Sequence, residues 1–112
     1  MAEYDPALDK VFQALADPTR RAVLDRLAQG PASVSELAAP HDMALPSFAK
    51  HIAMLEGAGL IRTIKKGRVR SCHLVPRAYR PADGWLARHR PLWDGKPDNL
   101  AQIAKSLYSP KR

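Results

Sequence analysis

Residues 33–57 form a pattern of a short helix, a tight turn and a longer helix. Ser33 and Glu36 have the spacing of a capping box, in which the serine caps the helix and the glutamate reaches back to the serine amide. Pro40 stops this first helix, because proline cannot continue the helical hydrogen-bond pattern. The second helix is expected over Leu45–Glu56. This order of elements predicts a helix-turn-helix at residues 33–57.

The second of these helices has one apolar face. The residues expected to face the core are Leu45, Phe48, Ile52 and Leu55. Pro46 is compatible with the first helical turn. Gly57 and Gly59 follow the helix, and Gly59 is the expected left-handed residue at its end.

A β-hairpin is expected next, at residues 60–75. Its strands are predicted at Leu60–Lys65 and Val69–Val75, with Lys66-Gly67-Arg68 as the turn. No Asp or Glu occurs between Gly57 and Ala82. The basic residues of that stretch are Arg62, Lys65, Lys66, Arg68, Arg70, Arg77 and Arg80. Like charges in so short a segment favour a negatively charged partner.

Two helices are expected before the helix-turn-helix. The first is predicted over Pro6–Ala16 with Asp5 as its cap, and the second begins at Asp17-Pro18 and ends at Gly30-Pro31. The fold is therefore predicted to be mainly α with a small antiparallel hairpin, a winged helix-turn-helix. We expect one domain over residues 1–112, because 112 residues is the size of a single domain.

The net charge of +7 and the pI of about 10.0 point to a polyanionic partner. In a helix-turn-helix, the second helix presents its N-terminal residues to the major groove of double-stranded DNA, and a basic hairpin contacts phosphates. The expected DNA-binding residues are Pro46, Ser47, Lys50, His51, Lys65, Lys66, Arg68, Arg70 and Arg20. For His51 the alternative is packing against the hairpin, and for Arg20 it is pairing with Asp17 or Asp25.

Other classes of protein are disfavoured. No catalytic pair of residues, metal cluster or phosphate-binding loop is recognisable, so an enzyme is not expected. The chain shows no signal peptide and no apolar run long enough to span a membrane, and its single cysteine, Cys72, suits a reducing compartment. We therefore expect a cytoplasmic protein without membrane partners. A winged helix that binds another protein instead of DNA is the main alternative.

Two segments resemble the ArsR/SmtB family of winged-helix repressors. Residues 17–24, which begin Asp17-Pro18-Thr19-Arg20-Arg21, resemble the second-helix signature of that family. Residues 45–61 resemble its recognition helix and the entry to its wing, and residues 62–74 resemble the wing itself. The resemblance extends roughly from Leu8 to Trp93. It implies a dimeric repressor that binds a pseudo-palindromic operator.

The resemblance also implies a homodimer in which the first and last helices pack across the two-fold axis. Residues 77–108 would then be a C-terminal dimerisation segment, with a break or kink at Pro97. The expected interface residues are Leu8, Phe12, Trp85, Leu92, Trp93, Leu100, Ile103 and Leu107. The competing interpretation is that Trp85 and Trp93 cover their own domain.

The chain departs from the family where many members bind metals. The stretch Ser35–Met43 lacks the cysteine pair of the thiolate sensors, and Asp83 and His89 do not have the zinc spacing. We therefore expect no metal and no cofactor, with a metal sensor of non-standard site as the alternative. For the effector, the sequence leaves three alternatives: a small molecule, a partner protein, or none.

Overall fold

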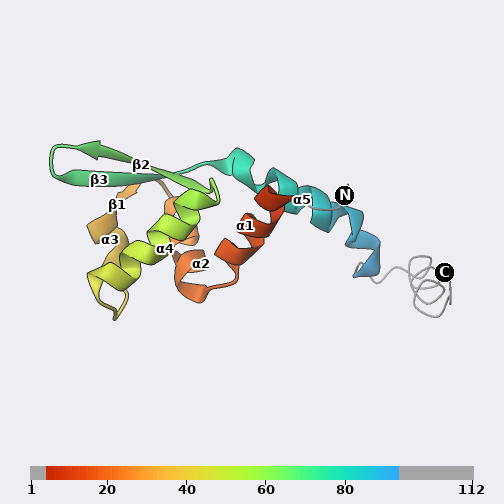
Figure 1. Cartoon of the computed structure of the whole chain (residues 1–112), viewed down its shortest axis with the longest axis horizontal. Helices are drawn as coiled ribbons and strands as arrows, with labels where there is room; N and C mark the ends of the chain where they lie inside the picture. Colours follow the sequence, from red (N-terminus) through yellow and green to blue (C-terminus); the bar gives the residue numbers. More distant parts are fainter. Residues whose placement is uncertain (1–4, 94–112) are drawn as a thin grey trace. The chain divides into compact units, whose positions relative to one another are not determined.

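A computed structural model of the chain describes residues 5–93. Of these, residues 5–81 belong to one compact unit and a second unit begins at residue 82. The first unit combines short helices with a small antiparallel sheet (Figure 1). This confirms the predicted mainly helical fold with a β-hairpin.

Helices α1 (Pro6–Leu15) and α2 (Pro18–Leu27) begin at the two Asp-Pro pairs, as predicted. The Asp5 carboxylate accepts hydrogen bonds from the first-turn N–H groups of α1, and the Asp17 carboxylate accepts one from the N–H of Arg20. Helix α2 ends at Leu27, three residues before the expected end at Gly30.

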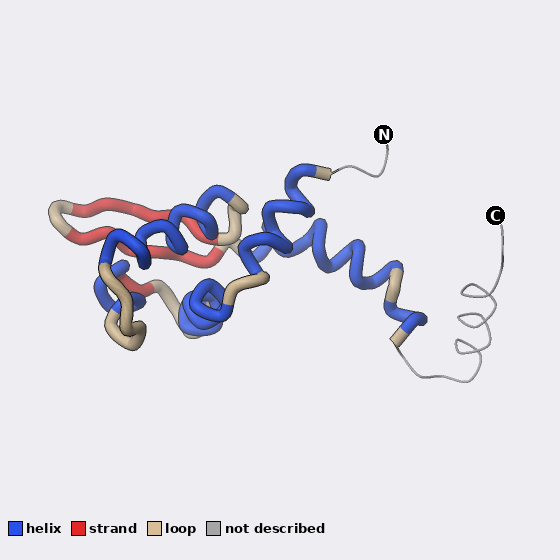
Figure 2. The backbone as a smooth tube through the Cα atoms, turned by 60° about the horizontal axis from the view of Figure 1, so that its bottom comes forward, coloured by secondary structure: helices blue, strands red, loops and turns tan. Residues whose placement is uncertain are grey.

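The helix-turn-helix consists of α3 (Val34–Ala38) and α4 (Leu45–Gly57). The capping box is present, because the N–H of Glu36 donates to the Ser33 hydroxyl at 3.1 Å and the N–H of Ser33 donates to the Glu36 carboxylate at 2.8 Å. Hydrogen bonding to Ser33 holds the pKa of Glu36 below its usual 4.5. Figure 2 shows the loop that joins the two helices.

The core forms around the inner face of α4. Phe48, Ile52 and Leu55 are buried there, as predicted. The prediction for Leu45 was wrong, because its side chain is 66% exposed. Helical spacing fixes the direction of a side chain around the axis but not how far along the axis the core extends. Leu45 is the first residue of α4 and lies beyond the end of that core.

The sheet has three strands in the order β1-β3-β2, namely β1 (Ala32–Ser33), β2 (Ile61–Lys66) and β3 (Val69–Leu74). Strands β2 and β3 form the predicted hairpin, which we call the wing. Its turn is the pair Gly67-Arg68, and Gly67 has φ +62°, a value that favours glycine. Gly59 after α4 has φ +77°, which confirms the left-handed residue predicted there.

Strand β1 was not predicted. Ala32 pairs with Cys72 and Ser33 pairs with Ser71, so the residues just before α3 are hydrogen-bonded to the middle of the wing. The helix-turn-helix and the wing are thereby joined through one sheet.

After β3 the chain forms a 3₁₀ helix (Pro76–Tyr79), α5 (Arg80–Arg88) and a further 3₁₀ turn (Arg90–Leu92). No helix in residues 5–93 is long and apolar enough to cross a membrane. Within the second unit, Leu86, Leu92 and Trp93 are exposed. The expected kink at Pro97 and the expected interface residues Leu100, Ile103 and Leu107 lie outside the described residues.

Candidate DNA-binding surface

The outer side of α4 carries the residues expected to meet DNA. Pro46, Ser47 and Lys50 are exposed, while Phe48 and Ile52 on the inner side are buried. Ala44 precedes the helix and makes no side-chain capping bond. The first two turns of α4 therefore present one hydroxyl and one ammonium group to solvent, among aliphatic side chains.

The His51 side chain faces α2. Its Nδ1 atom lies 3.1 Å from a guanidinium nitrogen of Arg20 and 3.6 Å from a carboxylate oxygen of Asp17. The side chain is about one-fifth exposed. The expected alternative of packing against the wing is wrong, because these contacts come from the first turn of α2. The prediction that His51 contacts DNA stays a prediction.

Arg20 links three helices. Its Nε donates to the carbonyl of Ala14 at 2.9 Å and one of its terminal nitrogens donates to the carbonyl of Gln13 at 2.8 Å, while the other contacts His51. These carbonyls lie in the last turn of α1, where acceptors lose the helical partners of the interior; that of Gln13 also accepts the N–H of Ala16 at 3.3 Å. The guanidinium of Arg20 thus caps α1 and holds α4 at the same time.

Two neighbours complete this junction. Arg21 donates to the carbonyl of Leu15 at 2.7 Å, so consecutive arginines satisfy three consecutive carbonyls of α1. Asp17 accepts the backbone N–H of Arg20, which is the main cause of its lowered pKa, and the nearby His51 and Arg20 act in the same direction. We refer to Asp17, Arg20, Arg21 and His51 as the α1–α2–α4 junction.

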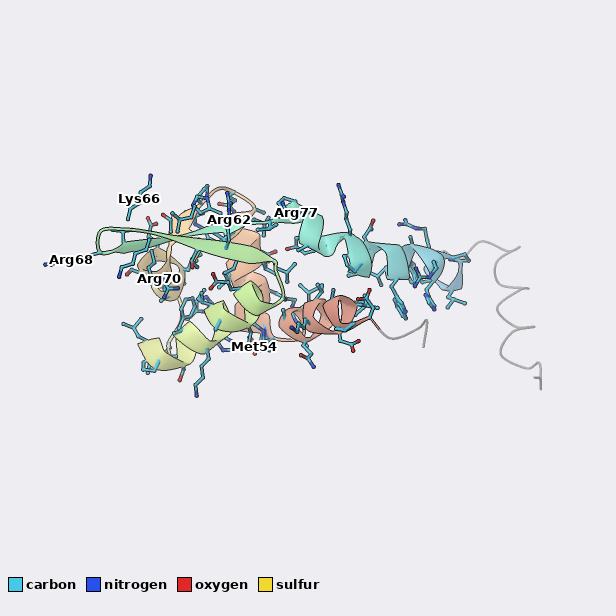
Figure 3. All side chains as sticks on the ribbon, turned by 45° about the horizontal axis from the view of Figure 1, so that its top comes forward. Met54, Arg62, Lys66, Arg68, Arg70 and Arg77 are labelled. Carbon is cyan, nitrogen blue, oxygen red and sulfur yellow. The ribbon has the colours of Figure 1, made fainter. Side chains whose placement is uncertain are left out.

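The basic side chains of the wing are divided between its two faces. Lys65 pairs with Arg70 across the strands, and the next pair, Lys66 with Val69, points to the other face. Arg68 lies in the turn, and Figure 3 shows it at the tip, with Lys66 and Arg70 on either side of the hairpin. All four basic residues are exposed. The wing therefore offers cations along both faces and at its end.

Lys65 and Arg70 are like charges directly opposite each other, an arrangement that destabilises a free hairpin. No acidic residue occurs in residues 58–81 to offset it. The nearest compensation is indirect, because Arg70 donates to the hydroxyl of Thr63 at 3.3 Å and that hydroxyl donates to Glu56 at 3.0 Å. Thr63 was not among the residues predicted for this surface, although its place on the same strand face as Lys65 could have indicated it.

A cleft of about 410 Å³ separates the start of α3 from the wing. Ser33 and Ser35 line one side, and Arg68 and Arg70 line the other. Hydroxyl and guanidinium groups are the side-chain donors that proteins commonly offer to phosphate oxygens. The cleft extends the basic surface of the wing toward the helix-turn-helix.

Cys72 lies inside the sheet rather than on this surface. It is fully buried, and burial raises the pKa of its thiol. Over residues 5–93, no three His, Cys, Asp or Glu side chains gather closely enough to hold a metal ion.

The helix-turn-helix, the three-stranded sheet and the basic wing define a winged helix-turn-helix of the DNA-binding class. A profile described as a helix-turn-helix domain matches residues 15–64. A crystal structure of an ArsR family transcriptional regulator is 58% identical and superposes with a TM-score of 0.73, covering 80% of this chain and 99% of that one. The chain belongs to the ArsR family of winged helix-turn-helix transcriptional regulators.

Two curated relatives match over the same region. The HTH-type transcriptional regulator Rv2034 of Mycobacterium tuberculosis is 41% identical over 68 residues, which are 61% of this chain and 64% of that protein. The transcriptional repressor SdpR of Bacillus subtilis is 34% identical over 61 residues, 54% of this chain and 68% of that repressor. The similarity thus spans about two thirds of each relative.

A homodimeric winged helix-turn-helix DNA-binding domain from Mycobacterium bovis shares the fold. Its solution structure is 23% identical and covers 80% of this chain and 93% of that domain, with a TM-score of 0.60.

Proposed function

We propose that this chain is a transcriptional repressor that binds double-stranded DNA through the outer side of α4 and the wing. One observation carries the proposal. Lys65 and Arg70 face each other on a hairpin that lies within an acid-free stretch, residues 58–81, and Glu56 reaches Arg70 only through Thr63, so a polyanion is the partner that would relieve their repulsion. The relatedness to the repressor of Bacillus subtilis supports the direction of regulation.

Helix α4 and the wing have different roles in this proposal. The N-terminal half of α4 enters the major groove, where Ser47 and Lys50 can hydrogen-bond base edges. Lys65, Lys66, Arg68 and Arg70 pair with phosphates and set affinity rather than sequence preference. Arg20 acts from within the α1–α2–α4 junction, so we assign it to positioning α4.

A homodimer would place two such surfaces on the DNA. The second unit leaves Leu92 and Trp93 about half exposed, and apolar area of this kind is typical of an interface. The homodimeric domain from Mycobacterium bovis, which shares the fold, supports this arrangement. Two identical subunits would bind half-sites about one helical turn apart.

The test is a gel-shift titration of the full chain with DNA from the promoter region of its own gene. We expect a shift that weakens steeply with salt, and a weaker shift for both Lys50→Ala and Arg68→Ala. If both variants and the wild type act alike in every DNA assay while the fold is intact, the chain is a protein-interaction module and the proposal fails. Sedimentation of the full chain at micromolar concentration tests the dimer.

A further inference from the structure

The first residue of α4 is a large aliphatic side chain that the fold leaves in solvent. Leu45 is 66% exposed, the highest fraction of any exposed large hydrophobic residue among residues 5–93. Pro46 and Ala49, its neighbours on the first turns, are exposed as well. A leucine side chain is stabilised by contact with apolar surface and cannot form hydrogen bonds, so it makes no favourable polar contact with water or phosphate.

The part of α4 that enters the groove can make few polar contacts. Ser47 and Lys50 are the exposed hydrogen-bonding side chains in its first two turns. His51 is held by Arg20 and Asp17, and Pro46 lacks an N–H group. Base recognition by this helix must therefore depend partly on apolar contact.

The major groove offers one common apolar group, the C5-methyl of thymine. We propose that Leu45 is a specificity-determining residue that recognises a thymine methyl in each half-site of the operator. The inference rests on the proposed function and adds the chemistry of one base position to it. The exposed Lys50 on the same helix and the exposed cations of the wing favour DNA over an apolar protein partner for this leucine.

The experiment removes the methyl group from the DNA. A random double-stranded pool is selected on the full chain, and the selected sequence becomes the probe. Each thymine is then replaced singly by deoxyuridine, which keeps base pairing and loses only the C5-methyl. Dissociation constants are measured by fluorescence anisotropy for the wild type, for Leu45→Ala and for Met54→Ala.

We expect one thymine per half-site at which deoxyuridine weakens wild-type binding about fourfold, the value of one buried methyl-sized group. Deoxyuridine at this thymine in both half-sites should weaken wild-type binding roughly 15-fold if the two half-sites act independently. Leu45→Ala should bind the thymine probe more weakly and show no further loss with deoxyuridine. Met54→Ala changes an exposed residue nine positions along the same helix, about 14 Å away, and should keep the loss.

Two results would overturn the inference. One is a loss with deoxyuridine that is the same for Leu45→Ala as for the wild type, and the other is indifference of the wild type to every thymine methyl. A chain that selects no DNA from the pool is a separate outcome, because it overturns the proposed function itself. Since Leu45 is exposed, its replacement is expected to leave the melting temperature unchanged, which a thermal scan checks.

Discussion

Arg20 and Arg68 are both cationic, but their different surroundings predict different roles in DNA binding, and the salt dependence of binding distinguishes those roles. Arg20 contacts two carbonyls of α1 and His51 of α4, whereas Arg68 makes no hydrogen bond or ion pair with the other residues of the 5–93 range. A cation that neutralises a phosphate releases counterions, so its removal changes the salt dependence of binding. A cation that only positions a helix changes affinity without changing that dependence.

The magnitudes follow from the contacts. Arg68→Ala removes one phosphate contact from each wing of a dimer, and each contact adds about 0.9 to the slope of log K against log salt, so the slope should fall by about 1.8. Between 50 and 200 mM salt, the deficit of this variant relative to wild type should then shrink by about 12-fold. Arg20→Ala should keep the wild-type slope.

Arg20→Ala should instead act on stability. Loss of a charged donor to partly buried acceptors costs about 1.5–3 kcal/mol of unfolding free energy, which corresponds to a melting temperature lower by roughly 10 °C. Arg21→Ala is the matched control, because the Arg21 side chain also caps α1 but, among residues 5–93, hydrogen-bonds only the carbonyl of Leu15. It should destabilise α1 without weakening DNA binding of the folded protein.

Fluorescence anisotropy across a salt series, with a thermal scan for each variant, measures all three quantities. The reasoning is refuted if Arg20→Ala lowers the slope as much as Arg68→Ala, since its guanidinium would then reach a phosphate in the complex. An unchanged slope for Arg68→Ala would refute the role of the wing tip.

Three further predictions concern the rest of the chain. Ser33→Ala should lower the unfolding free energy by about 1 kcal/mol. Because Glu36 has a folded pKa below 4.5, its contribution to this stability is present above pH 4.5 and declines as the pH falls. In urea unfolding, the difference between wild type and Ser33→Ala should therefore be smaller at pH 3 than at pH 7. The buried thiol of Cys72 should resist iodoacetamide in the native protein and react in 6 M urea, and rapid native labelling would contradict its burial. Leu92→Glu should shift sedimentation toward the monomer, and an unchanged dimer would exclude this residue from the interface.

Local signals in the sequence accounted for most of the helix starts and the wing turn. Asp5, Asp17 and Ser33 cap helices within three residues of themselves, and Gly67 is required by the turn in which it lies. Such interactions are complete within a few residues, so the sequence alone is enough to predict them.

Features that depend on distant residues could not be predicted. Strand β1 has only two residues and exists because Ala32 and Ser33 pair with β3 about forty positions later. The partners of Arg20 lie on α1 and α4, and a long side chain reaches them only once three helices have packed. The exposure of Leu45 likewise depends on where the core ends.

The pairing of β1 with β3 has a mechanical consequence. Ser33 pairs with Ser71, so β3 has a hydrogen-bonded strand on both sides at Cys72 and Ser71, and only β2 beside it from Arg70 to the turn. The turn residue Arg68 lies three residues farther on, an overhang of about 10 Å. A tilt of roughly 10° at Ser71 would move the end of this overhang by about 2 Å, more than a hydrogen bond tolerates. The position of the wing tip therefore depends on the pairing at Ser71. A substitution that weakens this pairing would be expected to displace the tip and change DNA affinity, although the substituted residue itself does not contact DNA.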